Sequence, residues 1–198
     1  FYTSRVFGSF LDEGARMLVE GIDPVLIESL ARQVGMPVGP LTAQDEIGQK
    51  SMCKATETHG TESEGKLSDN NYNGIVAKKL YQEHNRGGRH FGGGIYEYPE
   101  EGAKFIWPEV YGIFHKPEVG VPFEDIKDRV LFRQAIESLA CLEEGVLRSV
   151  ADGNVGSLLG IGAPSWTGGW LQMINTWEYN DLTGLPAFAV RARELDDK

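Results

Sequence analysis

Two glycine-rich segments are the first places where this sequence could do chemistry, because backbone N–H groups in such loops can cradle a phosphate. Gly160-Ile-Gly-Ala-Pro-Ser165 departs from the G-x-G-x-x-G fingerprint at its last position, and no strand is expected before it. Residues 87–94 lack the Gly-Lys-Ser/Thr ending of a P-loop. Ala163 and Thr167 stand at the two glycine positions of a serine-hydrolase elbow around Ser165. These departures favour structural turns over nucleotide-binding or nucleophilic sites.

Histidines, cysteines and acidic pairs offer no acid–base or metal chemistry either. The four histidines form no H-E-x-x-H pattern. Cys53 and Cys141 lie far apart without C-x-x-C spacing, which predicts two buried free thiols. Neighbouring acids on a helix point apart, and no histidine stands beside them; these pairs are Asp45-Glu46, Glu100-Glu101 and Glu143-Glu144. We therefore predict no catalytic residue, no metal site and no cofactor-binding residue in this chain.

A local basic segment contrasts with the acidity of the chain. Residues 77–90 hold Lys78, Lys79, Arg86 and Arg89 against Glu83, while the whole chain carries a formal net charge of −10. Such a segment could meet an anion such as a CoA phosphate, although a solvated helix face is the favoured interpretation. The net charge argues against a nucleic-acid surface.

Length and composition define the kind of protein. The chain has 198 residues, of which 41% are hydrophobic and 24% charged, as in a globular domain with a core. No apolar run approaches the roughly 20 residues of a membrane-spanning helix. Because the chain begins at Phe1 and its first residues already look like a helix inside a domain, we interpret it as a fragment of a longer protein.

Apolar spacing, proline and glycine predict an all-α fold. Gly21 closes the first helix, and Asp23-Pro24 opens the second as N-cap and first-turn proline. A polar stretch at 57–68 is expected to be an exposed loop, and the glycine-rich turn at 86–98 a short irregular or β-like excursion. The expected helices cover residues 4–22, 23–34, a stretch from 40, 70–84, 123–151, 167–179 and 185–195.

An internal repeat predicts two tandem helical domains. Shifting the sequence by 124 residues gives six identities over the nineteen positions 4–22. A little further on, Gly35-x-Pro37 matches Gly162-x-Pro164, so two ordered blocks recur at nearly one offset. We predict a first domain at 1–107, a proline-rich linker at 108–122 and a second domain at 123–198. The six identities are Arg5/Arg129, Val6/Val130, Glu13/Glu137, Leu18/Leu142, Glu20/Glu144 and Gly21/Gly145.

Several motifs together resemble a known family. Phe-Tyr-Thr-Ser-Arg-Val6 with Asp-Glu-Gly-Ala-Arg16, Gly35-Met-Pro-Val-Gly-Pro40 with Asp45-Glu-Ile-Gly48, and Gly92-Gly-Gly-Ile-Tyr96 resemble the C-terminal helical domain of 3-hydroxyacyl-CoA dehydrogenases. Cys141-Leu-Glu-Glu-Gly145 and the segment 160–169 are similar to the second tandem domain of multifunctional fatty-acid oxidation proteins. The resemblance implies two copies of this all-α fold, which is like the C-terminal domain of 6-phosphogluconate dehydrogenase.

The resemblance also implies a chemistry. Members of the family oxidise a 3-hydroxyacyl-CoA to the 3-ketoacyl-CoA with NAD, as a step of fatty-acid β-oxidation. For the multifunctional type, the resemblance implies a location in the cytoplasm. The NAD and the His base with its Glu partner belong to a preceding domain that this chain lacks. The helical part covers the acyl-CoA substrate, contacts that domain and often builds a homo-oligomer.

Two substrate contacts of the family fall on Ser4 and Leu159. Ser4 stands where the family has an Asn and keeps a hydroxyl donor; Leu159 stands where the second domain has a Tyr and cannot make a polar contact. Ser4 is expected to face the cleft of the catalytic histidine, and it could instead be an N-cap. The alternative function is a non-catalytic helical interaction or dimerisation module. A G-x-G-x-x-G segment and a catalytic His upstream of Phe1 would distinguish the enzyme from the module.

Overall fold

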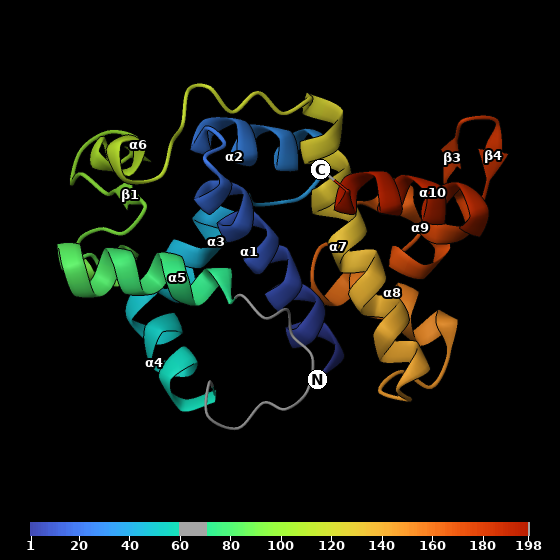
Figure 1. Ribbon diagram of the computed structural model, residues 1–198. Coiled ribbons are helices and arrows are strands. Elements are labelled where there is room, and N and C mark those ends of the chain that lie inside the picture. The colour runs from blue at the N-terminus through green and yellow to red at the C-terminus, as the bar shows by residue number, and fades with distance from the viewer. Residues whose placement is uncertain (60–70, 198) are drawn as a thin grey trace. The chain divides into compact units, whose positions relative to one another are not determined.

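The computed structural model describes residues 1–59 and 71–197 and confirms the all-α prediction (Figure 1). The strands form two small antiparallel hairpins, β1–β2 and β3–β4. Helix α4 runs to His59, and the rest of the loop expected at 57–68 falls largely outside the described residues. The elements are α1 (Tyr2–Glu20), α2 (Pro24–Gln33), α3 (Pro40–Ile47), α4 (Gln49–His59), α5 (Tyr72–Lys78), the π-helix η1 (Lys79–Glu83), the 3-10 helix η2 (Arg89–Phe91), β1 (Tyr96–Glu97), β2 (Phe105–Ile106), α6 (Glu109–Ile113), α7 (Phe123–Glu143), α8 (Val150–Gly160), the 3-10 helix η3 (Ser165–Thr167), α9 (Trp170–Thr176), β3 (Glu178–Tyr179), β4 (Leu182–Thr183) and α10 (Leu185–Asp196).

The chain divides into two compact units that differ from the domains expected at 1–107 and 123–198. Unit 1 comprises Phe1–Phe10, Leu30–Pro37 and Pro122–Lys198, and unit 2 comprises Leu11–Ser29 and Val38–Val121. Unit 1 thus contains the whole second predicted domain together with two short segments of the first. The tandem duplication itself stays a prediction.

The proline-rich segment 108–122, predicted as a linker without a helix, contains α6. Pro108 is the N-cap of α6 and therefore precedes the turn that its ring would disrupt. Val110 of this helix is fully buried. The segment is thus partly a packed element of unit 2.

Both copies of the repeat lie in long helices, α1 and α7, each followed by a shorter helix, α2 or α8. The Gly-x-Pro turns come after α2 and α8, and their glycines Gly35 and Gly162 have φ values of 103° and 70°. The order of long helix, short helix and Gly-x-Pro turn is therefore present twice, although the sequence predicts a single helix at 123–151, where the structure has α7 and the start of α8.

Helix ends follow local signals. The Asp23 side chain accepts a hydrogen bond from Val25 N at 2.8 Å, which is the predicted cap of α2. Helix α7 ends at Glu143, earlier than the predicted residue 151, because Gly145 adopts a left-handed φ of 75°. Ser149 then caps α8 by accepting a hydrogen bond from Asp152 N at 3.1 Å.

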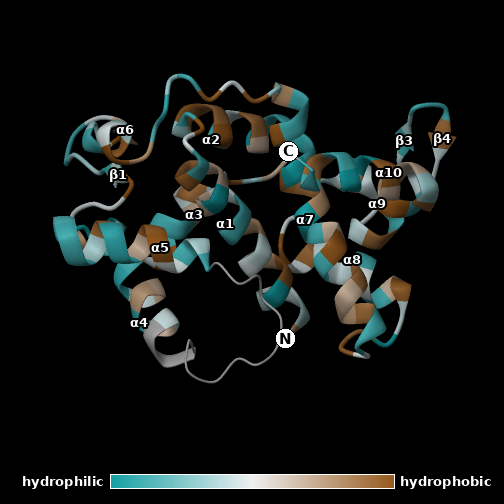
Figure 2. Cartoon of the chain, in the orientation of Figure 1, coloured by the Kyte–Doolittle hydropathy of each residue, from teal (hydrophilic) through white to brown (hydrophobic). Residues whose placement is uncertain are grey.

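The core of unit 1 is built on α7. Phe132 stacks on Phe188 of α10, with ring centroids 4.0 Å apart, and meets Trp177 edge-on at 4.7 Å. Trp170 and Met173 of α9 are almost fully buried. Figure 2 shows hydrophobic residues in brown interspersed with hydrophilic ones in teal along α7 and α8. Aromatic and aliphatic burial of this extent is the main force that holds α7, α9 and α10 together.

Asp45 organises the glycine-rich turn of unit 2. Its fully buried carboxylate accepts hydrogen bonds from Ile95 N at 2.8 Å and Tyr96 N at 2.9 Å. Gln49 Nε2 at 2.8 Å completes this environment, and burial raises the pKa of Asp45. The turn leads into β1, which pairs with β2 through Tyr96 and Ile106, as the β-like prediction expected.

Gly94→Ala is expected to destabilise the protein by about 1–3 kcal/mol, as overpacking of a filled interior does. A Cβ on Gly94 would lie within 2.1 Å of Asp45 Oδ1, and moving Asp45 would break its bonds to the turn. Denaturant unfolding measures this loss.

Gly112→Ala in α6 is the matched control within unit 2. Nothing lies within 4 Å of a Cβ there, so this helical variant should be neutral or slightly stabilising. Equal stability of the two variants would contradict the role of Gly94.

Candidate functional site

Both predicted substrate-contact residues lie exposed in unit 1. Ser4 lies in the first turn of α1, inside the helix rather than at the N-cap position before Tyr2. Leu159 lies near the end of α8 and is 85% exposed. A Cβ on Gly160 would be 2.9 Å from Thr3 Cγ2, so the residues next to Ser4 and Leu159 adjoin one another. The structure thus brings the start of α1 to the end of α8.

Tyr2 holds the start of α1 against α7 and α8 through its hydroxyl group. Its hydroxyl donates to Gly153 O at 3.0 Å and pairs with Ser138 Oγ at 3.0 Å. Gly156 allows the close approach, since a Cβ there would lie 3.1 Å from the Tyr2 ring. Burial raises the pKa of Tyr2, so this phenol stays protonated as a donor.

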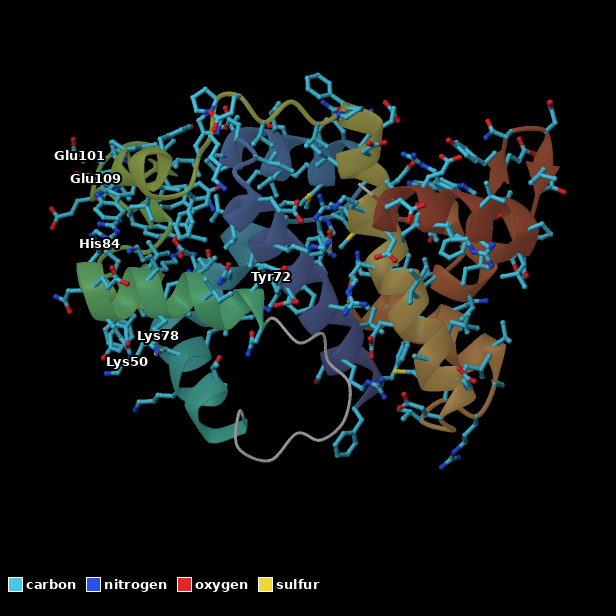
Figure 3. The ribbon with its side chains drawn as sticks, viewed as in Figure 1. Lys50, Tyr72, Lys78, His84, Glu101 and Glu109 are labelled. Carbon is cyan, nitrogen blue, oxygen red and sulfur yellow. The ribbon has the colours of Figure 1, made fainter. Side chains whose placement is uncertain are left out.

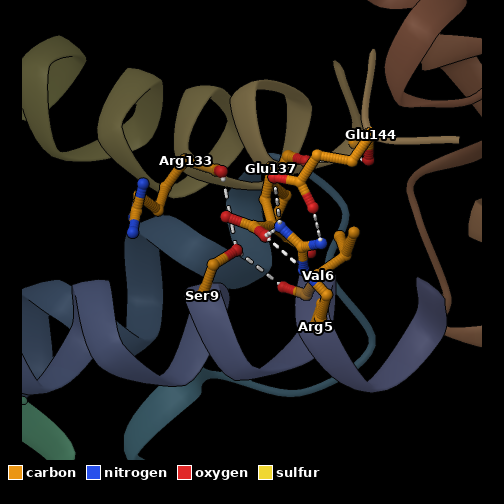
Figure 4. Close-up of polar contacts among 8 residues, drawn as sticks. Arg5, Val6, Ser9, Arg133, Glu137 and Glu144 are labelled. Atoms are coloured by element: carbon orange, nitrogen blue, oxygen red, sulfur yellow. Dashed lines mark hydrogen bonds and ion pairs between the residues drawn. The ribbon is translucent and has the colours of Figure 1, made fainter. Parts of the chain in front are cut away.

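Arg5 forms a clasp with two carboxylates, that of Glu137 in α7 and that of Glu144, the C-cap residue of this helix (Figure 4). Its Nε donates to Glu137 Oε1 at 2.8 Å, and its Nη1 lies 2.5 Å from Glu144 Oε2. Pairing with Glu144 and then with Glu137 raises the pKa of Arg5. Ser9 Oγ donates to Val6 O at 2.8 Å one turn further along α1. The internal repeat marks Glu137 and Glu144, but nothing in the sequence links them to Arg5, because they lie more than 130 residues away.

The surface around Ser4 and Leu159 combines a hydroxyl with apolar side chains. Val155 is 55% exposed and lies four residues before Leu159, so both share one face of α8. Such a surface can contact an aliphatic chain and donate one hydrogen bond.

Most basic side chains of residues 77–90 are paired with other groups of unit 2. Arg86 donates to Gly94 O at 2.6 Å and to Glu97 Oε1 at 2.9 Å, and its guanidinium lies 4.1 Å from the Trp107 ring centroid. Lys79 pairs with Glu83, and Arg89 with Glu46. Arg86 is therefore a structural residue rather than part of a solvated helix face.

Lysines on α4 and α5 remain at the surface of this unit. Lys78 is exposed on α5, and Lys50 Nζ of α4 lies 4.8 Å from the Phe91 ring centroid. Figure 3 shows Lys50, Lys78 and His84 projecting from this part of the chain. His84 packs edge-on against Trp107 at 5.4 Å. No pattern in the sequence indicated the Lys50–Phe91 contact.

The thiols and acidic groups that the structure describes form no metal-binding cluster. Cys53 and Cys141 are buried thiols that form no disulfide with each other, as predicted, and burial raises the pKa of Cys141. Across residues 1–59 and 71–197, no cluster of three His, Cys, Asp or Glu side chains is arranged for a metal ion. In those same residues, no helix combines the length and apolar character needed to cross a membrane.

Comparisons with known proteins agree on one family. Residues 1–98 match the family model "3-hydroxyacyl-CoA dehydrogenase, C-terminal domain". The chain is 30% identical over 179 residues to the fatty acid oxidation complex subunit alpha of Shewanella baltica strain OS185, covering 89% of this chain and 25% of that protein. It is 29% identical over 177 residues to the subunit of the same name from Vibrio cholerae, covering 89% and 24%.

A solved structure shares the fold. The dehydrogenase part of multifunctional enzyme 1 from C. elegans superposes with a TM-score of 0.71 at 22% identity, covering 98% of this chain and 43% of that one. The chain spans about a quarter of the length of its curated relatives. The match over residues 1–98, supported by the similarity along most of the chain and by the shared fold, leads to one assignment: residues 1–98 belong to the 3-hydroxyacyl-CoA dehydrogenase C-terminal domain family.

Proposed function

We propose that this chain is the substrate-side portion of an NAD-dependent 3-hydroxyacyl-CoA dehydrogenase of fatty-acid β-oxidation. The observation that carries the proposal is the junction of α1 and α8, which places the two expected substrate contacts, Ser4 and Leu159, on adjoining exposed turns within a family-matched chain. The proposed partners are the acyl-CoA substrate, the enzyme's own NAD-binding domain and a second copy of the chain.

The glycine-rich segments do not fit NAD. Gly88 N donates to Gly93 O at 2.8 Å and Gly93 N to Gly88 O at 3.2 Å, so these backbone donors are used within the turn. In the other segment, Ala163 N donates to Ser157 O at 2.9 Å. A pyrophosphate needs such donors free. The nicotinamide cofactor and the acid–base pair are therefore assigned to another part of the enzyme.

This chain then contributes binding and orientation. In the proposal, the hydroxyl of Ser4 donates a hydrogen bond to a substrate oxygen, and the aliphatic face of Val155 and Leu159 contacts the acyl portion. Placing a substrate in a reactive geometry lowers the barrier without any group of this chain taking a proton.

Ser4→Ala in the full-length enzyme is expected to lower kcat/KM roughly two- to tenfold, the loss of a neutral hydrogen bond of about 0.5–1.5 kcal/mol. The melting temperature should stay nearly unchanged, because Ser4 is exposed and lies inside the helix rather than capping it. Steady-state kinetics and thermal unfolding measure the two quantities.

Ser149→Ala is the matched control, because it removes a serine that does cap a helix of unit 1. It should cost about 0.5–2 kcal/mol of stability and leave kcat/KM alone. Normal kinetics for Ser4→Ala would remove Ser4 from the site. A full-length protein without NAD-dependent turnover would favour the alternative, a non-catalytic helical interaction or dimerisation module.

A further inference from the structure

We propose that Arg5 is a positioning residue, which holds Ser4 in place for the substrate through its clasp by Glu137 and Glu144. The inference rests on the proposed function and concerns how Ser4 is held in position for the substrate. Arg5 itself need not touch the substrate, because its guanidinium is turned toward α7.

The contacts fix the first turn of α1 at two points. Tyr2 and Arg5 are three residues apart and therefore lie on the same side of the helix, where each bonds to another element of unit 1. Ser4 is rotated about 100° from Arg5 around the helix axis, because an α-helix has 3.6 residues per turn. Loss of the clasp would release this turn to rotate, and Ser4 would move with it.

Each of the two carboxylates contacts two nitrogen atoms of the Arg5 guanidinium. Glu137 has a side chain only 9% exposed and engages Nε and Nη2, while the more exposed Glu144 engages Nη1 and Nη2. A planar guanidinium can serve two carboxylates in this way, whereas a lysine ammonium is a single point donor. The geometry is therefore specific for arginine.

The test is a double-mutant cycle in the full-length enzyme. Arg5→Met is expected to lower kcat/KM by about as much as Ser4→Ala and not more, roughly two- to tenfold, because it acts only through Ser4. In the Ser4→Ala background, Arg5→Met should change kcat/KM by less than about twofold, because residues that act through one another are not additive. Arg5→Lys should restore part of the loss, since it keeps the charge but not the fork.

Two further variants separate positioning from folding. Arg191→Met removes another arginine of unit 1 that pairs with two carboxylates, those of Asp125 and Asp128 near the start of α7. This variant should lower the melting temperature without changing kcat/KM of the folded enzyme. Glu144→Gln loosens the clasp at its exposed end and provides a mild variant if Arg5→Met does not fold.

The outcomes distinguish the two proposals. If the wild-type enzyme turns over and the losses of kcat/KM caused by Arg5→Met and Ser4→Ala multiply in the double variant, the positioning role is overturned and the proposed function stands. Absence of NAD-dependent turnover in the wild-type enzyme would overturn the proposed function and this inference with it. Non-additive effects with partial rescue by Arg5→Lys would support both.

Discussion

The isolated 198-residue chain is expected neither to bind NAD nor to oxidise a 3-hydroxyacyl-CoA. The backbone donors of its glycine-rich turn bond to one another, as in the pair Gly88–Gly93. Two of its histidines are engaged in packing and backbone contacts, since His84 meets Trp107 and His115 Nδ1 lies 3.0 Å from Gly21 O. Loss of the cofactor and of the acid–base pair removes the whole enzymatic acceleration, which is at least about 10⁶-fold for a typical enzyme.

Calorimetric titration with NAD and the absorbance of NADH under saturating substrate measure this directly. The same chain joined to its NAD-binding domain is the positive control. Measurable turnover by the chain alone would show that it carries catalytic groups that neither its sequence nor its fold reveals.

Arg191→Ala is expected to cost about 3–5 kcal/mol of folding free energy, the largest effect of any single ion-pair change in unit 1. Arg191 is 4% exposed and donates to Asp125 Oδ1 at 2.8 Å and to Asp128 Oδ2 at 2.7 Å. Removing the guanidinium takes away a cation that pairs with the buried Asp125 and the partly buried Asp128, and desolvation already raises the pKa of Asp128. Denaturant unfolding of the chain and its variants provides the measurement.

Lys127→Ala is the control on α7, the helix that carries the partners Asp125 and Asp128. Its partner Glu124 has a side chain 73% exposed, and exposed pairs of this kind contribute about 0–1 kcal/mol. The double variant Asp125→Leu with Arg191→Met should be less destabilised than Arg191→Ala, because it removes charges on both sides. Equal losses of folding free energy for Arg191→Ala and Lys127→Ala would mean that water solvates the ion pairs of Arg191 as it does the exposed pair of Lys127.

Local signals in the sequence determined the fold class and many helix ends. The apolar spacing of α1, the Asp23-Pro24 start of α2 and the turn at residues 86–98 all follow from the conformational preferences of a few neighbouring residues. The motif pattern also led to the family, because the ordered blocks from Ser4 to Tyr96 lie within the matched segment. These properties depend on short-range interactions that the sequence displays directly.

Packing decided the lengths and boundaries that local signals left open. Helix α6 formed inside a segment that its prolines marked as a linker, and its Val110 is fully buried. Unit 1 took in the start of α1, although the sequence predicts a boundary after residue 107. A boundary between units depends on which apolar faces bury one another, and this is a property of the whole chain.

The proposed binding surface shows the same division. Ser4 and Leu159 could be named from motifs, but only the tertiary structure showed that their neighbours Thr3 and Gly160 adjoin. The clasp of Arg5 joins residues more than 130 positions apart, and Asp45 meets a turn some 50 residues away. Side-chain pairs of this kind cannot be read from spacing, because the entropy of closing such long loops is overcome only by the packing of the complete fold.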